Sequence, residues 1–258
     1  MASTSTARQA GTTHCVAIDL GAMFVRVVEV EQSAGESRIM RRGIAALPPH
    51  VWNDIATNRD GMANSIREAM ASAGIAAKTV VACIPRHLVT VRFAQLPHAL
   101  PAQLRGMIEF EAQQYILFPL HEVTLDYRVL TGAGAGLSSP GQDDMQTVLL
   151  VAARKSLVGE IMKVFDKTGL ELTQLSVSAL ALAEHGRDAL EPTALINLEP
   201  GGLDVAVVAE GQLLFTRASA LDIQNSLPDV AGRRLAEEVA RSFTAYQNEF
   251  RQIGRAHV

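Results

Sequence analysis

Two segments of the chain repeat one pattern: an apolar β-branched run, an acid or amide, a glycine turn and a second apolar run. The first pairs Cys15–Gly21 with Phe24–Val30, and the second pairs Ala194–Gly202 with Leu203–Ala209. Each pattern predicts a β-hairpin, because strand-forming residues flank a turn that contains glycine. Glycine after a strand lets backbone N–H groups approach an anion closely. The repeat therefore predicts two anion-facing hairpins, one near the start of each half.

Composition narrows the classes of protein that these hairpins can belong to. The chain has 258 residues, of which 48% are hydrophobic, and a net charge of −4. It is long enough for one large or two ordinary domains, and it lacks the basic surplus of a nucleic-acid-binding protein. No apolar run approaches the roughly 18 residues of a membrane span, and the polar segment Met1–Thr13 lacks a signal-peptide core. We therefore expect a cytoplasmic chain with a disordered lead.

The potential metal-ligating and catalytic residues show no functional spacing. Cys15 and Cys83 lie in apolar, strand-like runs, which predicts two buried thiols. The histidines are scattered without ligand spacing. Glu109 and Glu111 stand two residues apart on a predicted helix and so point to different faces. We predict no catalytic and no metal-ligating residue.

The rest of the chain predicts a small module between the hairpins. After the first hairpin come a strand over 37–45, a helix over 60–73 capped by Asp60, and a buried strand over 79–84. This order predicts an antiparallel meander continued by a parallel strand. The module then has strands over 88–93, 123–130, 146–153 and 172–177, helices over 101–118 and 156–168, and a polar loop over 131–145. A strand over 212–217 and an amphipathic helix over 233–250 follow the second hairpin.

The module carries the most specific residues of the chain. Glu109-Phe-Glu-Ala-Gln-Gln-Tyr-Ile-Leu-Phe-Pro119 is followed by Leu125-Asp-Tyr-Arg-Val-Leu130 and by Leu149-Leu-Val-Ala-Ala-Arg-Lys155. With these stretches the chain resembles the PilM family of type IV pilus assembly proteins, which belongs to the actin-like ATPase superfamily and is related to the division protein FtsA. The resemblance covers nearly everything from Cys15 to Phe250. It implies an α/β, actin-like (ribonuclease H-like) two-domain fold with an α+β insertion.

The resemblance also implies a division of the chain. The disordered lead covers 1–13, the first actin-like subdomain 14–86 and 173–192, the inserted subdomain 87–172, and an incomplete second actin-like subdomain 193–252. The helical subdomain of the family is reduced here, because only Ala218–Gly232 separates the last strand from the last helix. The six residues Ile253–Val258 match a translated sequencing adapter, so we expect a C-terminally truncated chain whose native sequence differs after Gln252.

The family's two phosphate hairpins imply a site for ATP and Mg²⁺. The matching positions are Asp19, Gly21, Arg26, Asn197, Gly201, Gly202 and Asp204. Several neighbours depart from the family: Ala22, Met23 and Phe24 replace small hydroxyl residues, and Asp204 stands about where a Thr is usual. A carboxylate near phosphates repels them unless a metal intervenes. Asp19 either steers Mg²⁺ or satisfies turn amides, and Arg26 either contacts phosphate or is a plain exposed residue. The resemblance thus implies an ATP site that is degenerate.

In the family, the protein is a cytoplasmic scaffold, peripheral to the inner membrane. It binds the short N-terminal tail of PilN, a single-span protein, between the first subdomain and the inserted one, and it contacts other platform proteins. The residues that we expect in the wall of that groove are Val89, Val91, Phe93, Glu111, Gln114, Tyr115 and Phe118. For the cluster of Tyr115, Phe118 and Pro119, a place in the core is the alternative.

A second function class stays open at this point. An actin-like ATPase or small-molecule kinase needs intact phosphate hairpins, a catalytic acid and a subdomain beside the adenine. A third class, a division-type membrane tether, needs a C-terminal amphipathic helix. Gene neighbourhood separates the first two classes, because pilus genes favour the scaffold and metabolic genes favour the kinase.

Overall fold

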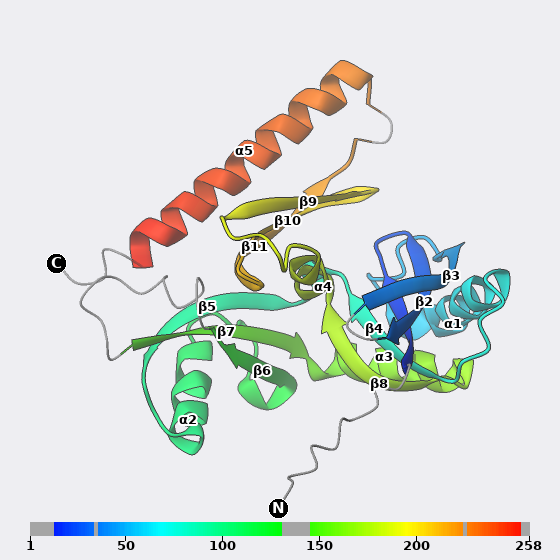
Figure 1. The fold of residues 1–258 in the computed structure, drawn as a ribbon, viewed down its shortest axis with the longest axis horizontal. Helices are drawn as coiled ribbons and strands as arrows, with labels where there is room; N and C mark the ends of the chain where they lie inside the picture. The colour runs from blue at the N-terminus through cyan, green and yellow to red at the C-terminus, as the bar shows by residue number, and fades with distance from the viewer. Residues whose placement is uncertain (1–12, 34–35, 131–144, 224–225, 254–258) are drawn as a thin grey trace, which may run out of the picture. The chain divides into compact units, whose positions relative to one another are not determined.

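The computed structural model describes residues 13–33, 36–130, 145–223 and 226–253. The chain forms two compact units (Figure 1). The first unit contains the described residues up to Leu20, Phe24–Cys83 and Lys163–Leu175. The second contains Gly21–Met23, Ile84–Met162 and the chain from Ser176 onward. Within the described part, no helix is both long and apolar enough to cross a membrane.

A five-stranded sheet with the order β3-β2-β1-β4-β8 forms the centre of the first unit. Its strands are β1 (Thr13–Leu20), β2 (Phe24–Ser33), β3 (Glu36–Ala46), β4 (Thr79–Ile84) and β8 (Glu171–Val177). Strands β1, β2 and β3 pair antiparallel, and β4 lies parallel to β1. The first hairpin and the meander continued by a parallel strand are therefore confirmed. Val16, Ile18 and Leu20 of β1 are buried with Val25 and Val27 of β2, which gives this sheet its apolar face.

Helix α1 (Ile55–Ser72) covers the β2 and β3 side of this sheet. It buries Met62, Ile66 and Ala69, as their helical spacing predicts. The helix begins earlier than predicted, because Asp54 is its N-cap and accepts the backbone N–H of Thr57 at 3.2 Å. The prediction that Asp60 is the cap is wrong. Asp60 lies inside the helix, and its carboxylate accepts from Lys167 Nζ at 2.7 Å.

Glycine is required where β3 passes α1. A Cβ built on Gly43 would lie 2.1 Å from the carbonyl oxygen of Ala69. Any side chain there would push the strand off the helix. Beside this contact the hydroxyl of Ser65 donates to the carbonyl oxygen of Ala46 at 2.6 Å. Close packing and a partly buried hydrogen bond thus hold the covering helix against the sheet.

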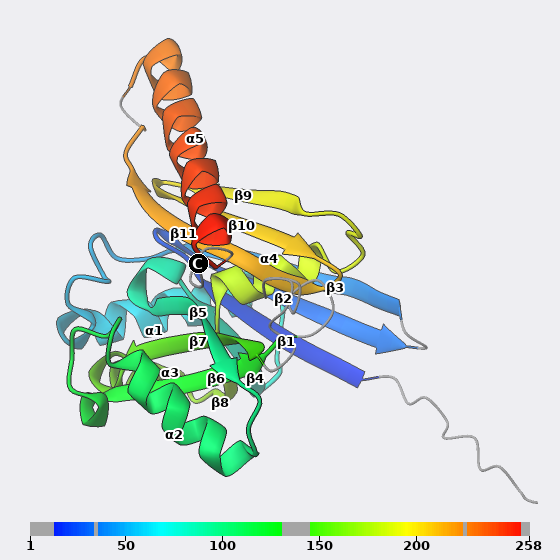
Figure 2. The same ribbon diagram turned by 90° about the vertical axis from the view of Figure 1, so that its left-hand side faces the viewer.

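The second unit contains most of the predicted α+β module. The prediction is wrong for the strand over 172–177, which is β8 and pairs in the sheet of the first unit. Strands β5 (Thr90–Pro97), β7 (Met145–Arg154) and β6 (Val123–Val129) form an antiparallel sheet in that order, and α2 (Pro101–Ala112) lies beside it (Figure 2). Leu104 and Ile108 of α2 pack against Ala94, Leu96 and Leu150. The helix ends six residues before the predicted end. Pro119 disfavours helical backbone at Phe118, and the chain turns after Ala112.

The second hairpin lies in a separate sheet of the same unit. Strands β9 (Thr193–Glu199), β10 (Gly201–Ala209) and β11 (Gln212–Leu221) pair antiparallel in the order β11-β10-β9, which confirms the prediction. Helix α5 (Pro228–Ile253) packs Leu235 and Val239 against Leu203 and Val205 of this sheet. Only Asp222–Leu227 separate β11 from α5, in line with the predicted reduction of the helical subdomain.

The remaining helical segments are α3 (Lys155–Thr168), α4 (Ser178–His185) and two short 3₁₀ turns, η1 (Arg86–Leu88) and η2 (Leu120–Glu122). Helix α4 is missing from the sequence prediction, because Ala and Leu alternate in it and hide the helical period. The prediction of two buried thiols is wrong for Cys15, which is exposed because burial along β1 begins only at Val16. Cys83 is partly buried. The predicted loop over 131–145 lies outside the described residues, apart from Met145, which opens β7.

Candidate functional site

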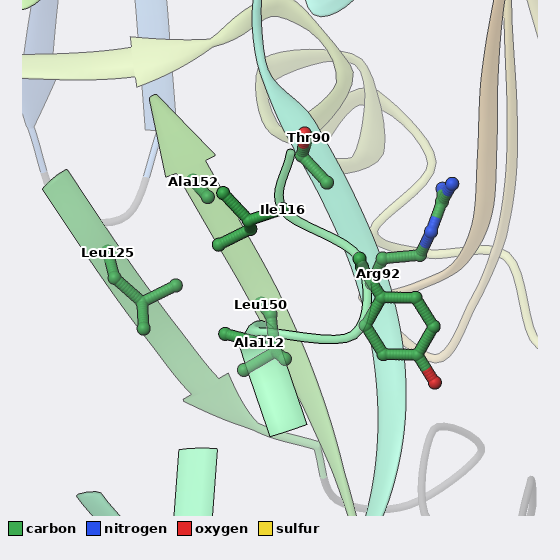
Figure 3. A pocket seen from close by; sticks show the side chains of 8 residues that line it. Thr90, Arg92, Ala112, Ile116, Leu125, Leu150 and Ala152 are labelled. Atoms are coloured by element: carbon green, nitrogen blue, oxygen red, sulfur yellow. The ribbon is translucent and has the colours of Figure 1, made fainter. Parts of the chain in front are cut away.

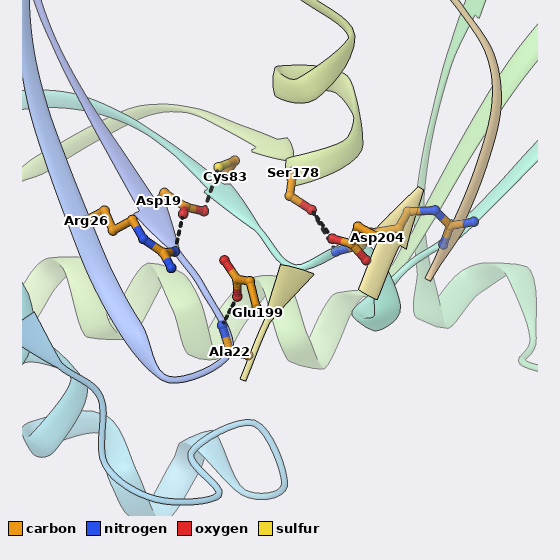
Figure 4. A network of polar contacts seen from close by, with 8 residues as sticks. Asp19, Ala22, Arg26, Cys83, Ser178, Glu199 and Asp204 are labelled. Atoms are coloured by element: carbon orange, nitrogen blue, oxygen red, sulfur yellow. Dashed lines mark hydrogen bonds and ion pairs between the residues drawn. The ribbon is translucent and has the colours of Figure 1, made fainter. Parts of the chain in front are cut away.

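The first hairpin joins an acid to a base across the strands. Asp19 and Arg26 are register partners in β1 and β2, and Nη1 of Arg26 lies 2.9 Å from Oδ2 of Asp19. The thiol of Cys83 on β4 lies 3.3 Å from Oδ1 of Asp19 (Figure 4). The side chains of Asp19 and Arg26 are 35% and 38% exposed. The structure thus brings these two predicted site residues together as a partly solvated ion pair.

The second hairpin turns through Pro200 and Gly201. Gly201 has a φ of +85°, a value that suits glycine, and a Pro-Gly pair is the usual sequence of a type II turn. Asn197 and Asp204 are register partners in β9 and β10. Oδ2 of Asp204 accepts from the hydroxyl of Ser178, at the start of α4, at 3.3 Å. That hydroxyl also accepts the backbone N–H of Arg86 at 3.0 Å, so a chain of polar contacts links β10 to η1.

Arg86 places a buried positive charge beside this chain of contacts. Its residue is 7% exposed, and Nη1 donates to the carbonyl oxygen of Val89 at 2.8 Å. Nε of Arg86 has no hydrogen-bond partner within the part of the chain that the structure describes. Burial, and then the neighbouring charge of Arg92, lowers the pKa of Arg86 to about 10, while Asp204 and Glu249 act in the opposite direction. The guanidinium therefore stays charged at neutral pH.

Glu199 is a functional candidate that the sequence reasoning did not single out. Its Oε2 accepts the backbone N–H of Ala22, in the turn of the first hairpin, at 2.9 Å (Figure 4). His87 of η1 is also close: burial lowers the pKa of His87, whereas the charge of Glu199 acts to raise it. A signal was present in the repeat itself. Asp19-Leu-Gly21 in the first hairpin corresponds to Asn197-Leu-Glu199 in the second, so Glu199 stands where the first pattern has glycine.

Some features of these residues disfavour a bound polyphosphate. The amide of Ala22 already binds a carboxylate. Ala22, Met23 and Phe24 supply no side-chain hydroxyl, and Glu199 and Asp204 add two carboxylates in the second hairpin. Carboxylates near a polyphosphate repel it. Among the residues with described positions, no group of three or more His, Cys, Asp or Glu side chains is placed to hold a metal ion.

A small apolar pocket opens in the inserted module, between the end of α2 and the β5-β7-β6 sheet (Figure 3). Its lining is Thr90, Arg92, Ala112, Tyr115, Ile116, Leu125, Leu150 and Ala152. The guanidinium of Arg92 lies 5.9 Å from the ring centroid of Tyr115, a cation–π distance. The hydroxyl of Tyr115 donates to Oε1 of Glu111 at 3.0 Å. The pocket thus has an apolar floor and a charged rim.

The predicted groove residues divide between this surface and the core. Tyr115 and Phe118 are 38% and 43% exposed, so the alternative of a core position is wrong for both. The ring of Phe118 lies 5.0 Å below the guanidinium carbon of Arg154. Gln114 is exposed, donates to Glu111 and lies beside this surface, whereas Phe93 is half-buried.

Val89 and Val91 are 8% and 3% exposed and lie in the core. Their neighbours Thr90 and Arg92 line the pocket instead, because alternate residues of a strand face opposite sides of a sheet. Val91, and Val89 immediately before the strand, therefore lie on the face of β5 opposite the pocket. The alternation of β5 alone does not say which of its faces looks toward α2.

Comparison with known proteins places this fold in a class. A family model described as "Type IV pilus assembly protein PilM" matches residues 17–249. A solved structure described as a "PilM-PilN type IV pilus biogenesis complex" aligns with a TM-score of 0.69 at 21% identity, over 93% of this chain and 73% of that one. The cytoplasmic domain of EpsL, an inner-membrane component of the type II secretion system of Vibrio cholerae, aligns with a TM-score of 0.53 at 12% identity, over 82% and 73%.

The two-unit α/β arrangement is thus the actin-like fold predicted from the sequence. Because the family model covers most of the chain, this protein belongs to the PilM family of type IV pilus assembly proteins.

Proposed function

We propose that this protein is a scaffold of the type IV pilus assembly platform, bound at the cytoplasmic face of the inner membrane. Its partner is the short cytoplasmic tail of a PilN-like, single-span membrane protein. The observation that carries the proposal is the small apolar pocket beside the exposed side chain of Tyr115, in a chain that belongs to a pilus assembly family and aligns with a solved pilus biogenesis complex.

The surface around the pocket suits an extended peptide that lies across it, because the pocket itself has room for no more than a water-sized group. Ala112, Ile116 and Leu125 supply an apolar floor without charge. Exposed aromatic side chains beside a pocket are typical hot spots of peptide binding, since they bury a large area with few rotatable bonds. Arg92 stands at the rim and offers donors to backbone carbonyl or carboxylate oxygens of the tail. The tail would then contact the inserted module from α2 to β5.

A peptide titration tests this proposal. A fluorescently labelled synthetic peptide with the N-terminal tail sequence of a PilN-like protein is titrated with the full chain. We expect binding that weakens by roughly tenfold or more in Tyr115→Ala and Arg92→Glu. Arg128→Glu is the matched control, because Arg128 is exposed on β6 of the same sheet and does not line the pocket. If the tail does not bind, the proposed scaffold function is wrong. If all variants bind it equally, the tail binds elsewhere than at the pocket.

The alternative of an ATPase or kinase finds no support in the hairpins. Both activities require that the polyphosphate reach backbone amides at the turns, and the amide of Ala22 is occupied by Glu199. We therefore place the function of the protein in partner binding and treat nucleotide binding below.

A further inference from the structure

We propose that Glu199 is a built-in substitute for a bound phosphate and that it closes the first hairpin turn to nucleotides. Its carboxylate takes the backbone N–H of Ala22, the kind of donor that an oxyanion needs at a glycine turn. The inference goes beyond the proposed scaffold function and does not depend on it, because peptide binding at Tyr115 involves neither residue.

The hydrogen bond between the Ala22 amide and the Glu199 carboxylate involves an ionised acceptor. An ionised carboxylate accepting an N–H at 2.9 Å makes a charge-assisted hydrogen bond. Because Glu199 belongs to the same chain as Ala22, it competes at an effective concentration in the millimolar range or above. An external phosphate must displace this carboxylate before it reaches the amide, so its apparent affinity falls by the fraction of molecules in which the turn is open.

The backbone of Glu199 is held in place. It is the last residue of β9 and the register partner of Gly202 across the hairpin. Pro200 and Gly201 follow immediately, and the positive φ of Gly201 fixes the turn. A side chain on such a rigid base loses less conformational entropy on making its contact than one on a mobile loop. The backbone N–H of Ala22 is thus bound by a preorganised carboxylate, that of Glu199.

Charge adds to this exclusion. A nucleotide triphosphate brings several negative charges to a turn that already faces the carboxylate of Glu199. His87 stands near Glu199, but burial lowers its pKa, so it does not supply a lasting positive charge to phosphate at neutral pH. Removing the carboxylate therefore removes both the occupant of the amide and a repulsive charge.

The test is a titration of the full chain with a fluorescent ATP analogue and Mg²⁺, with pyrophosphate as a second probe. Wild type, Glu199→Gly and Glu199→Gln are compared with the matched controls Glu191→Gly and Glu191→Gln, since Glu191 is exposed in the same unit. We expect wild type to show no binding at ligand concentrations up to about 1 mM. The affinity of Glu199→Gly for the ligand should be higher by roughly tenfold or more. The Gln variant, which keeps an acceptor oxygen but loses the charge, should lie between them.

A second measurement does not depend on ligand binding. The amide resonance of Ala22 should move upfield in Glu199→Gly and Glu199→Gln and stay in place in both controls. Micromolar binding of the analogue by wild type would overturn the proposal. So would a folded Glu199→Gly variant that gains no affinity, or an Ala22 amide that does not respond. Retained tail-peptide binding shows that the variants are folded and separates this result from the scaffold function.

Discussion

The two hairpins share a sequence pattern and a backbone arrangement, yet they compensate their charges differently. In the first, Asp19 faces Arg26 across the strands, and about a third of each side chain is exposed. In the second, Asp204 is linked through Ser178 to η1, where Arg86 is buried. A solvated ion pair contributes little to the stability of the fold. A buried charge has a large desolvation cost, so it depends on the groups that surround it. The comparison shows that the sequence pattern specifies the turn of each hairpin. Burial sets how strongly each charged side chain affects the stability of the fold.

The largest effect is expected at Arg86. Arg86→Ala removes the donor to the Val89 carbonyl and the packing of the buried side-chain stem. We expect the free energy of unfolding to fall by about 3 kcal/mol, because a buried carbonyl loses its donor and the truncated stem leaves a cavity. Urea denaturation measures it, with the exposed Arg128→Ala as control at about 0.5 kcal/mol or less. A loss at Arg86 as small as in the control would contradict the contrast between the hairpins.

An intermediate effect is expected at Glu238 of α5, which packs against the sheet of the second hairpin. Its residue is 7% exposed, and Oε1 lies 2.8 Å from Nη1 of Arg217 on β11. The neighbouring hydroxyl of Ser219 and the guanidinium of Arg217 hold the pKa of Glu238 below its ordinary value of 4.5. Because the pKa is lower in the folded state, this carboxylate stabilises the fold above the ordinary value, and the stabilisation disappears as pH falls through the folded pKa.

Glu238→Gln should therefore lower the free energy of unfolding by about 1–3 kcal/mol at neutral pH. The variant should also lose less stability than wild type as the pH falls below 4.5. Thermal unfolding between neutral and acidic pH measures both effects. Glu237→Gln, at an exposed neighbouring position, is the control. Parallel pH curves for Glu238→Gln and wild type would show that Glu238 does not carry this dependence.

The smallest effect is expected at the first hairpin. Arg26→Ala breaks the pair with Asp19, but both groups are partly solvated, so we expect a change of about 1 kcal/mol or less. The difference from wild type should shrink between about 0.05 M and about 0.5 M NaCl, because salt screens exposed charges. Chemical denaturation by urea at the two salt concentrations measures it. A large loss of stability that does not change with salt concentration would contradict the contrast. It would mean that charged side chains contribute similarly to stability in both hairpins.

Much of the fold could be predicted because it rests on local pattern. Alternation and glycine turns located both hairpins, and helical spacing located α2, α3 and α5. Predictions from local sequence pattern were wrong where contacts with other elements decide the structure. Alternating Ala and Leu concealed α4, and the cap of α1 lay before its apolar face at Asp54. The alternation of β5 does not say which of its faces lines the pocket, because the strand shows the same alternation whichever side α2 covers.

The sequence by itself determined the family and the two hairpin turns, since these depend on residue types at short spacing. Only the tertiary structure decided which groups meet at the candidate sites. Ala22 and Glu199 are 177 positions apart, and Arg86 and Ser178 are 92 apart. No local periodicity records such contacts, because they follow from how the strands pair and pack. The closed first turn and the pocket at Tyr115 are therefore properties of the folded chain.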